Sequence, residues 1–320
     1  MDEDKLLVRI AEMYYQEDKN QSQISKELNI HRTTISRLLK RSREEGIVQI
    51  NINYDMAGTY NIEKKMEMIF DLQKAIVIPV ATDMKRPQKD TLLAQALGKY
   101  LTEIIINGMV IGFSWGETMA AVSREIPELN LPNVTCVPMI GGPSGRLISE
   151  YHVNTITYAA AKKMNGKALL IDSPAIPETR ELRDALLKNE FNQELIRLWQ
   201  QLDIAIMGVG SPSLSANKTW LQFYGDDVIR TITEREIVGD VVSRFYTIKG
   251  DPVESELDCR IIGITIENLL RTPHRIGVAE SLEKVTALLG ALRGKYINTL
   301  VTTEETAKEI LRQHELSMRK

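Results

Sequence analysis

The chain has 320 residues, of which 40 are Lys or Arg and 43 are Asp or Glu, so its formal net charge at pH 7 is −3. This length exceeds one typical domain, and the balanced charge excludes a protein that binds nucleic acid over its whole surface. No stretch approaches the roughly 18 apolar residues of a membrane helix, and the acidic N-terminus is unlike a signal peptide. Cys136 and Cys259 lie in apolar surroundings, and the four histidines have no ligand spacing. We expect a cytoplasmic protein with reduced core cysteines, no metal and no cofactor.

The first fifty residues carry the pattern of a helix-turn-helix. Apolar residues recur on one face of residues 2–16, which predicts a first helix of about four turns. Residues 21–28 predict a short second helix, and the spacing of Asn20 and Gln23 at its start suits a capping box. Residues 29–31 are long enough only for the tight turn before a third helix. The first helix is expected to turn inward Leu6, Leu7, Ile10, Ala11 and Tyr14.

The predicted third helix, residues 31–43, has one apolar and one basic face. Ile35, Leu38 and Leu39 form the apolar stripe, and the segment holds five Arg or Lys residues but no Asp or Glu. Such a helix suits the DNA major groove, because Arg and Lys neutralise phosphates and Arg also binds guanine edges. The alternative is a solvated amphipathic helix, but the single sign of charge and the order of elements favour DNA. The residues expected to contact DNA are Gln23, Arg32, Thr33, Thr34, Ser36, Arg37, Lys40 and Arg41.

The helix is expected to stop at Gly46, and the alternating residues 47–52 predict a strand that forms a wing beside it. Residues 1–50 contain nine basic and nine acidic side chains, so one such unit would bind DNA weakly. This balance favours a homodimer or homotetramer that reads repeated half-sites. We therefore expect a helix-turn-helix DNA-binding domain over residues 1–53.

Residues 54–72 are expected to form a linker and a bridging helix, because Ile62, Met66 and Phe70 recur every four residues. From residue 73 to 320, short apolar runs alternate with helical segments. This order predicts an α/β domain with a doubly wound, mainly parallel sheet covered on both faces. Strands are expected at 74–80, 109–113, 134–140, 168–171, 204–209, 241–248, 261–264, 276–279 and 299–302. Helices are expected at 88–106, 116–126, 149–164, 178–200, 226–236, 281–292 and 304–314.

Three glycine-rich loops follow predicted strands, at residues 112–118, 141–146 and 208–211. Ligands of a parallel sheet bind at such strand ends. Small residues let the backbone approach an anion, and the helix that starts near residue 116 offers unpaired N–H groups. Ser114 and Thr118 add hydroxyl donors. A small anionic ligand is therefore expected, while the absence of a Walker A motif or a well-placed GxGxxG disfavours a nucleotide.

Motifs in order along nearly the whole chain resemble the SorC family of bacterial sugar-responsive transcriptional regulators. The resemblance implies a winged helix-turn-helix joined to an effector domain related in fold to ribose-5-phosphate isomerase and glucosamine-6-phosphate deaminase. Members are mostly tetramers whose binding to operator DNA is controlled by phosphorylated sugars. The motifs are Ile35-Ser36-Arg37-Leu38-Leu39, Arg43-Glu44-Glu45-Gly46-Ile47-Val48, Gly112-Phe113-Ser114-Trp115-Gly116-Glu117-Thr118, Ile140-Gly141-Gly142, Asn154-Thr155, Met207-Gly208-Val209-Gly210, Gly239-Asp240, Arg260-Ile261-Ile262-Gly263 and Leu300-Val301-Thr302-Thr303-Glu304.

The resemblance implies that the loop 114–118 and Lys284 hold the phosphate and that Asp240 bonds sugar hydroxyls. Glu117 departs from what a phosphate site needs, since its carboxylate repels the anion unless it turns away. The full set of expected effector-binding residues is Gly112, Ser114, Gly116, Glu117, Thr118, Gly141, Gly142, Arg146, Gly208, Gly210, Asp240 and Lys284.

Ile140 separates this chain from one branch of the family. The deoxyribonucleoside regulators have a lysine there that forms a Schiff base with their effector, which isoleucine cannot do. The effector domain is most similar to that of the central glycolytic gene regulators, whose ligand is a fructose bisphosphate, although the Gly-Gly loop differs in length. Arg146 is a candidate for a second phosphate.

The expected function is a transcriptional regulator, and specifically a repressor, of a carbohydrate-metabolism operon. Its expected partners are double-stranded operator DNA, a phosphorylated sugar and further copies of the chain. The alternative is an enzyme, a sugar-phosphate isomerase or deaminase with an accessory DNA-binding module. That reading needs a general acid or base such as His152, for which the sequence supplies no paired group.

Overall fold

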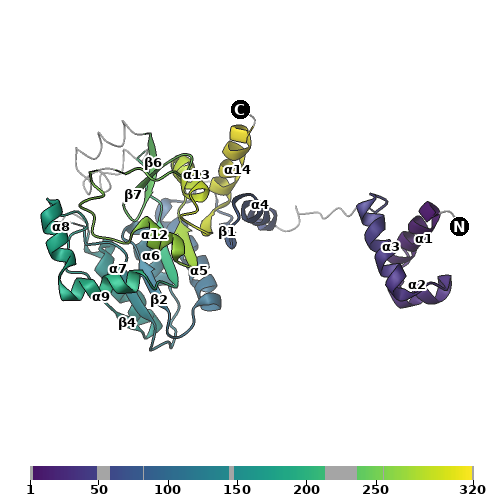
Figure 1. The fold of residues 1–320 in the computed structure, drawn as a ribbon, viewed down its shortest axis with the longest axis horizontal. Coiled ribbons are helices and arrows are strands. Elements are labelled where there is room, and N and C mark those ends of the chain that lie inside the picture. Colours follow the sequence, from purple (N-terminus) through teal and green to yellow (C-terminus); the bar gives the residue numbers. More distant parts are fainter. Residues whose placement is uncertain are drawn as a thin grey trace. The chain divides into compact units, whose positions relative to one another are not determined.

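The computed structural model describes residues 3–48, 58–81, 83–143, 148–212, 236–254 and 256–318. The chain divides into two compact units, residues 1–56 and residues 57–320, and Figure 1 shows the elements of both. Within the described ranges, no helix combines the length and the apolar character that a membrane crossing requires.

The first unit contains three helices around a small core. They are α1 (Glu3–Tyr15), α2 (Gln21–Leu28) and α3 (Arg32–Glu44). Ile35, Leu38 and Leu39 of α3 are buried, as the periodicity predicts. The prediction for α1 was wrong at Tyr14, which is exposed, while Met13 is fully buried in its place.

Local signals set the ends of α2 and α3. The capping box at the start of α2 is confirmed, since Asn20 accepts from the Gln23 N–H and the Gln23 side chain accepts from the Asn20 N–H. Asn29 ends α2 with φ +54°, and Gly46 follows α3 with φ +74°, the left-handed region that favours these residue types. Most of the predicted wing, 47–52, lies outside the described residues; Ile47 and Val48 form no strand.

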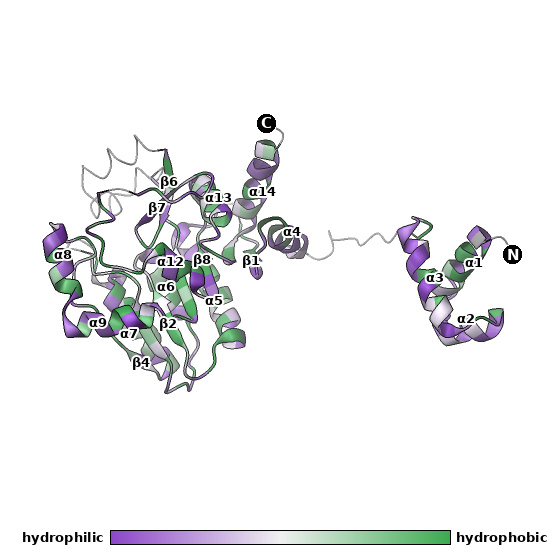
Figure 2. Cartoon of the chain, in the orientation of Figure 1, coloured by the Kyte–Doolittle hydropathy of each residue, from purple (hydrophilic) through white to green (hydrophobic). Residues whose placement is uncertain are grey.

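The second unit begins with α4 (Tyr60–Phe70) and is built on a seven-stranded sheet in the order β1-β9-β8-β5-β2-β3-β4. Every neighbouring pair is parallel. Each face of the sheet carries its own buried core, and in Figure 2 the inner strands are largely coloured as hydrophobic. The strands are β1 (Lys74–Ile78), β2 (Val110–Phe113), β3 (Thr135–Pro138), β4 (Lys167–Ala168), β5 (Ile204–Gly208), β8 (His274–Val278) and β9 (Thr299–Thr303).

Strand order reverses at the centre of this sheet. From β2 the chain moves outward through β3 and β4, then returns to place β5 on the other side of β2. Neighbouring crossovers therefore diverge from the gap between β2 and β5, which is where doubly wound sheets bind ligands. The main helices of the unit after α4 are α5 (Arg86–Ile104), α6 (Glu117–Glu125), α7 (Val153–Met164), α8 (Arg180–Leu187), α9 (Glu190–Trp199), α12 (Ile266–Arg271), α13 (Val285–Arg293) and α14 (Glu304–Met318).

Three strand predictions were wrong. Of the predicted strand 168–171, only Ala168 belongs to a strand, the short β4. The predicted strand 241–248 is part of an antiparallel hairpin, β6 (Ile237–Val241) and β7 (Arg244–Thr247), because Val242 and Ser243 turn the chain with φ +50° and +62°. Residues 261–264 form only an isolated bridge between Gly263 and Ile140.

The predicted helix 281–292 divides into a 3-10 turn (Leu282–Lys284) and α13. Two further predicted helices are broken by residues that cap the next helix. Residues 178–200 divide into α8 and α9, where the Asn189 side chain accepts from the Phe191 N–H. Residues 149–164 divide into a 3-10 turn (Ser149–Tyr151) and α7. Helix α12 was not predicted, and the predicted helix 226–236 lies, except for its last residue, outside the described residues. Cys136 is buried as expected, but Cys259 is exposed.

The two edges of the sheet are protected differently. At one edge, β4 has only two residues. At the other, α4 covers β1: Glu63 Oε1 accepts from the Val77 N–H (2.9 Å), and Glu67 Oε1 accepts from the Ala75 N–H (3.2 Å). These carboxylates pair backbone donors that an edge strand would otherwise offer to another chain.

Candidate effector cavity and DNA-binding helix

A cavity of about 120 Å³ lies beside the carboxyl ends of β2 and β5, where the strand order reverses. We call it the switch-point cavity. Eight residues predicted for the effector site line it, namely Ser114, Gly116, Glu117, Thr118, Gly208, Gly210, Asp240 and Lys284. Sequence reasoning did not assign seven others to the site, namely Arg86, Trp115, Met119, Tyr151, Val209, Val242 and Ser243.

The remaining predicted residues do not line the cavity. A Cβ on Gly112 would lie 2.6 Å from the Met139 side chain, and one on Gly141 would lie 2.5 Å from the Pro174 backbone. A Cβ on Gly142 would lie 2.7 Å from the His152 ring. These glycines are therefore needed for close packing. Arg146 lies in residues 144–147, outside the described part of the chain.

The N-terminus of α6 forms one wall of the cavity. Gly116 precedes the helix with φ +119°, a conformation that requires glycine, and no side chain caps the helix there. The first-turn N–H groups of a helix have no intrahelical acceptor and carry partial positive charge. The Ser114 hydroxyl oxygen accepts from the Gly208 N–H at 3.3 Å, which joins this loop to the loop after β5.

Thr118 does not offer its hydroxyl hydrogen to the cavity. The Thr118 hydroxyl donates to Asp90 Oδ1 on α5 at 3.0 Å, and both side chains are buried. The other oxygen, Asp90 Oδ2, is buried and has no hydrogen-bond partner within the described residues. Burial raises the pKa of Asp90.

Lys284 brings a buried cation to the cavity. Its side chain follows the turn at Ser281, which has φ +108°, and the residue is only 8% exposed. Among the described residues, its ammonium group has no hydrogen bond or ion pair. Burial lowers the pKa of Lys284, and the charge of Arg86 lowers it further. Since an unpaired buried charge is costly, this arrangement favours an anion in the cavity.

The part of the lining that comes from residues 240–243 is polar and strained. Asp240 Oδ2 accepts from the Ser243 N–H at 3.1 Å, and the backbones of Asp240 and Gly210 are paired by two hydrogen bonds of 2.9 and 3.2 Å. Val242 adopts φ +50°, which is strained for a β-branched residue. Such strain is concentrated at functional sites.

Glu117 lies in the loop that should receive an anion, and the structure shows how its charge is balanced. Glu117 Oε2 lies 3.7 Å from an Arg86 guanidinium nitrogen, so the carboxylate has a cation beside it. The same guanidinium lies 3.7 Å from Asp90 Oδ2. The unlike charges at the first turns of α5 and α6 therefore offset one another.

His152, the acid or base of the enzyme alternative, has a structural role. Its Nδ1 accepts from the Asn154 N–H at 3.1 Å and so caps α7. Burial lowers the pKa of His152, which favours the neutral form that accepts this bond. In the described ranges, no group of three or more His, Cys, Asp or Glu residues is placed to hold a metal ion.

The basic face of α3 is open to solvent. Arg32, Thr33, Ser36, Arg37 and Lys40 are exposed, while Thr34 and Arg41 are partly buried. Arg41 Nε donates to Glu45 Oε1 at 2.5 Å, and Lys40 lies 3.7 Å from Glu44. Arg41 and Lys40 are thus each engaged by a carboxylate one turn away, and the contact of Arg41 is the shorter.

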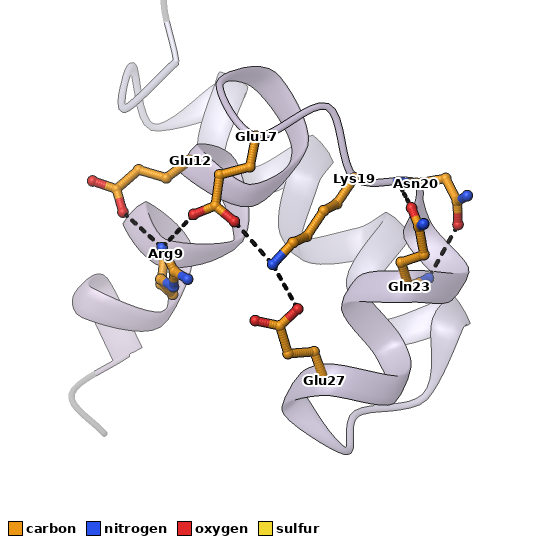
Figure 3. A network of polar contacts seen from close by, with 7 residues as sticks. All are labelled: Arg9, Glu12, Glu17, Lys19, Asn20, Gln23 and Glu27. Atoms are coloured by element: carbon orange, nitrogen blue, oxygen red, sulfur yellow. Dashed lines mark hydrogen bonds and ion pairs between the residues drawn. The ribbon is translucent and has the colours of Figure 1, made fainter.

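Two cations outside α3, Arg9 and Lys19, are paired with carboxylates of the first unit. Figure 3 shows Arg9 between Glu12 and Glu17, and Lys19 between Glu17 and Glu27. Figure 3 also shows the capping box, in which the Gln23 side-chain oxygen accepts from Asn20. Both pairs lie outside α3, and the capping box holds the Gln23 side chain at the start of α2.

A helix-turn-helix followed by an α/β domain with a small-ligand cavity defines a class, the ligand-responsive transcriptional regulators. Residues 54–312 match the Sugar-bind family, described as "Putative sugar-binding domain", and residues 3–50 match the homeodomain-like family HTH_23. The sorbitol operon regulator of Klebsiella pneumoniae is 38% identical over 97% of this chain and 99% of its own length. The deoxyribonucleoside regulator of Bacillus subtilis (strain 168) is 29% identical over 97% of this chain and 99% of its own length.

Solved structures agree with these matches. The crystal structure of the full-length sorbitol operon regulator SorC from Klebsiella pneumoniae superposes with a TM-score of 0.77, covering 97% of this chain and 100% of that one at 38% identity. The chain belongs to the SorC family of transcriptional regulators. Its relatives are named as operon or transcriptional regulators, which favours a regulator over the isomerase or deaminase alternative.

Proposed function

We propose that this chain represses a carbohydrate-metabolism operon and that a phosphorylated sugar or sugar alcohol in the switch-point cavity controls its binding to operator DNA. The observation that carries the proposal is Lys284, a buried ammonium group on the cavity wall that makes no hydrogen bond or ion pair with the described residues, although the charges of Asp90, Glu280 and Asp240 act on it. A phosphate bound at the N-terminus of α6 would give this ammonium group a directly contacting anion.

The polarity of the cavity supports a monophosphate ester of a polyol. Its cationic part holds Lys284, Arg86 and the first turn of α6. Its other part holds the Asp240 carboxylate, which accepts hydrogen bonds from hydroxyl groups, together with Ser243. Because a relative that is 38% identical is a sorbitol operon regulator, six-carbon sugars and sugar alcohols are the first candidates.

The DNA-binding surface is proposed to be the exposed face of α3. Arg32, Arg37 and Lys40 are exposed there. Gln23 lies on the preceding helix, α2, where the capping box holds its side chain. We assign base contacts to Arg37 and a phosphate contact to Arg41. A homodimer or homotetramer would bind two half-sites at once and so offset the weak binding of one unit.

The first experiment is a thermal-shift and calorimetric panel of hexose 1- and 6-phosphates and hexitol phosphates, each beside its unphosphorylated parent. Sorbitol 6-phosphate and sorbitol form one such pair. A ligand at about 100 times its Kd adds about 2.7 kcal/mol of stability. We expect at least one phosphate ester to stabilise the protein and its parent sugar to have far weaker affinity. Equal affinity for ester and parent would reject the phosphate site.

The second experiment measures operator binding by fluorescence anisotropy with the DNA upstream of the neighbouring operon. A bound effector must favour one arrangement of the protein by about 1–3 kcal/mol to control DNA binding. We therefore expect the stabilising phosphate ester to shift operator affinity about five- to 150-fold. An ester that binds the cavity and leaves operator affinity unchanged would reject its role as the effector.

A further inference from the structure

Arg86 opens α5 and lies on the wall of the switch-point cavity, although no glycine-rich loop or family motif pointed to it. We propose that Arg86 is a second cation for the phosphate group of the ligand, held ready by Asp90 and Glu117 until the ligand arrives. This inference rests on the proposed function, because it names a further residue of the same site.

The contacts of Arg86 are loose. Its guanidinium lies 3.7 Å from Asp90 Oδ2 and 3.7 Å from Glu117 Oε2, and within the described residues it makes no hydrogen bond. Charge-assisted bonds of arginine are normally about 2.7–2.9 Å long. Elsewhere in the same chain, Arg312 reaches Glu309 at 2.7 Å. Arg86 therefore keeps its directional donors available, with the side chain 38% exposed.

Arg86 also lies at the N-terminus of α5, where the positive end of the helix dipole disfavours a cation. The start of α5 has no acidic residue in its first turn, and Lys85, Arg86 and Lys89 place three cations where the helix dipole is already positive. Cations there are unfavourable to the helix. Lys89 has a partner in Glu280 at 3.8 Å. The dipole of α5 therefore does not favour Arg86 at this position, and its nearest carboxylates are Asp90, one turn on, and Glu117 of α6.

Arg86 and Lys284 act on the same small region from two elements. Both line the switch-point cavity, and the charge of Arg86 is felt at Lys284. Two like charges across a cavity repel each other, and a dianionic phosphate between them converts that repulsion into two attractions. The planar fork of arginine matches two phosphate oxygens, whereas lysine acts as a point charge. Arg86 would therefore raise the preference for a phosphate ester over its parent sugar.

A contact between Arg86 and the phosphate would also reduce the repulsion between the phosphate and the carboxylate of Glu117. Without a ligand, Arg86 offsets the carboxylates of Glu117 and Asp90. When phosphate binds, Arg86 lies between the anion and these carboxylates, which lowers their repulsion. A phosphate loop that contains a glutamate can then still bind an anion, provided that Arg86 is present.

The test compares Arg86→Met and Arg86→Lys with the wild-type full-length protein. Calorimetry would measure the affinity for inorganic phosphate, sorbitol 6-phosphate and sorbitol. We expect Arg86→Met to lower the affinity for both phosphate compounds about tenfold or more, which is the effect of losing a hydrogen bond to a charged group. The affinity for sorbitol should stay unchanged. Arg86→Lys should give an intermediate loss, because it restores the charge without the fork.

Arg124→Met is the matched control. Arg124 is an arginine of α6 with a similarly long ion pair, 3.8 Å to Glu150, and it does not line the cavity. It should bind all three compounds as the wild type does. The inference is overturned if Arg86→Met keeps the wild-type affinity for phosphate. It is also overturned if the affinities for sorbitol and for sorbitol 6-phosphate fall equally, because a merely structural role of Arg86 would have that effect.

The two levels of the proposal fail differently. If the wild type binds neither inorganic phosphate nor any phosphate ester of the panel, the proposed function fails and Arg86 loses its role with it. If Lys284→Met abolishes phosphate binding while Arg86→Met and Arg86→Lys both match the wild type, the proposed function stands and only the assignment of Arg86 is rejected.

Discussion

The chain places its cations in two opposite settings. On α3, Arg32, Arg37 and Lys40 are exposed to water, so their charges cost the fold little. At the switch-point cavity, Lys284 is buried, and burial lowers its pKa because the ammonium group has lost its hydration. The first group is suited to a large polyanion that can approach any open surface. The second is suited to one small anion that must enter a cavity.

This difference separates two ways of gaining affinity. Exposed cations bind DNA mainly by releasing condensed counterions, so that interaction weakens steeply with salt. A buried cation acts at short range, where salt screens little and where its desolvation has already reduced the stability of the fold. The two surfaces should therefore respond in opposite ways to mutation and to ionic strength.

The largest expected effect is that of Lys284→Met. Affinity for phosphate esters should fall by about 2–5 kcal/mol, because one partner of a buried charge pair is removed. The unliganded protein should become more stable, since a lysine pKa lowered by the fold means that the ammonium form destabilises it at neutral pH. Calorimetry and thermal unfolding measure the two effects. A mutant that binds phosphate normally, or that unfolds at a lower temperature without ligand, would contradict this account.

The next effect is that of Arg37→Ala on α3. Operator affinity should fall by about 1–3 kcal/mol and discrimination against mutated operators should weaken, because we assign this side chain to base contacts. Anisotropy titrations with operator and scrambled DNA at one salt concentration measure both. Lys26→Ala on the exposed face of α2 is the control. Unchanged operator affinity would leave α3 as a solvated helix only.

Arg41→Ala should have a smaller and less selective effect. We assign Arg41 to a phosphate of the DNA backbone, so the affinities for operator and scrambled DNA should fall equally. The slope of log K against log salt should fall by about one. The Glu45 carboxylate already engages Arg41, which reduces the loss. A salt series with both DNAs measures the slope, and a loss confined to the operator would transfer Arg41 to base recognition.

The smallest expected effect is the pH dependence of Asp90. Its pKa is raised by burial, so the folded state holds this proton more tightly than the unfolded state. Stability should therefore fall as pH rises from the ordinary aspartate pKa through the raised value, and the full cost is present above it. Asp90→Asn keeps an acceptor for Thr118 and removes the charge. Thermal unfolding should show a stability gain of Asp90→Asn at neutral pH that vanishes on acidification.

Sequence reasoning succeeded where the cause of structure is local. The bounds of α2 agree with the prediction to the residue, because capping box and turn residues lie within one segment. The cavity needed contacts across the chain: Thr118 meets Asp90 of α5, 28 positions earlier. One local signal was present at Arg86, namely basic residues without any acidic residue at a helix start. The hairpin was missed because Val242, a β-branched residue, is an unusual choice at a turn with positive φ.

The cover that α4 provides for β1 has a consequence for preparing the protein. A fragment that begins at residue 73 keeps the whole parallel sheet but loses Glu63 and Glu67, which pair the backbone of Val77 and Ala75. Its first strand would then present a bare row of amides to any neighbouring molecule in solution. Such a fragment should precipitate or form oligomers through pairing of its edge strands during purification. A fragment that retains α4 should not aggregate in this way.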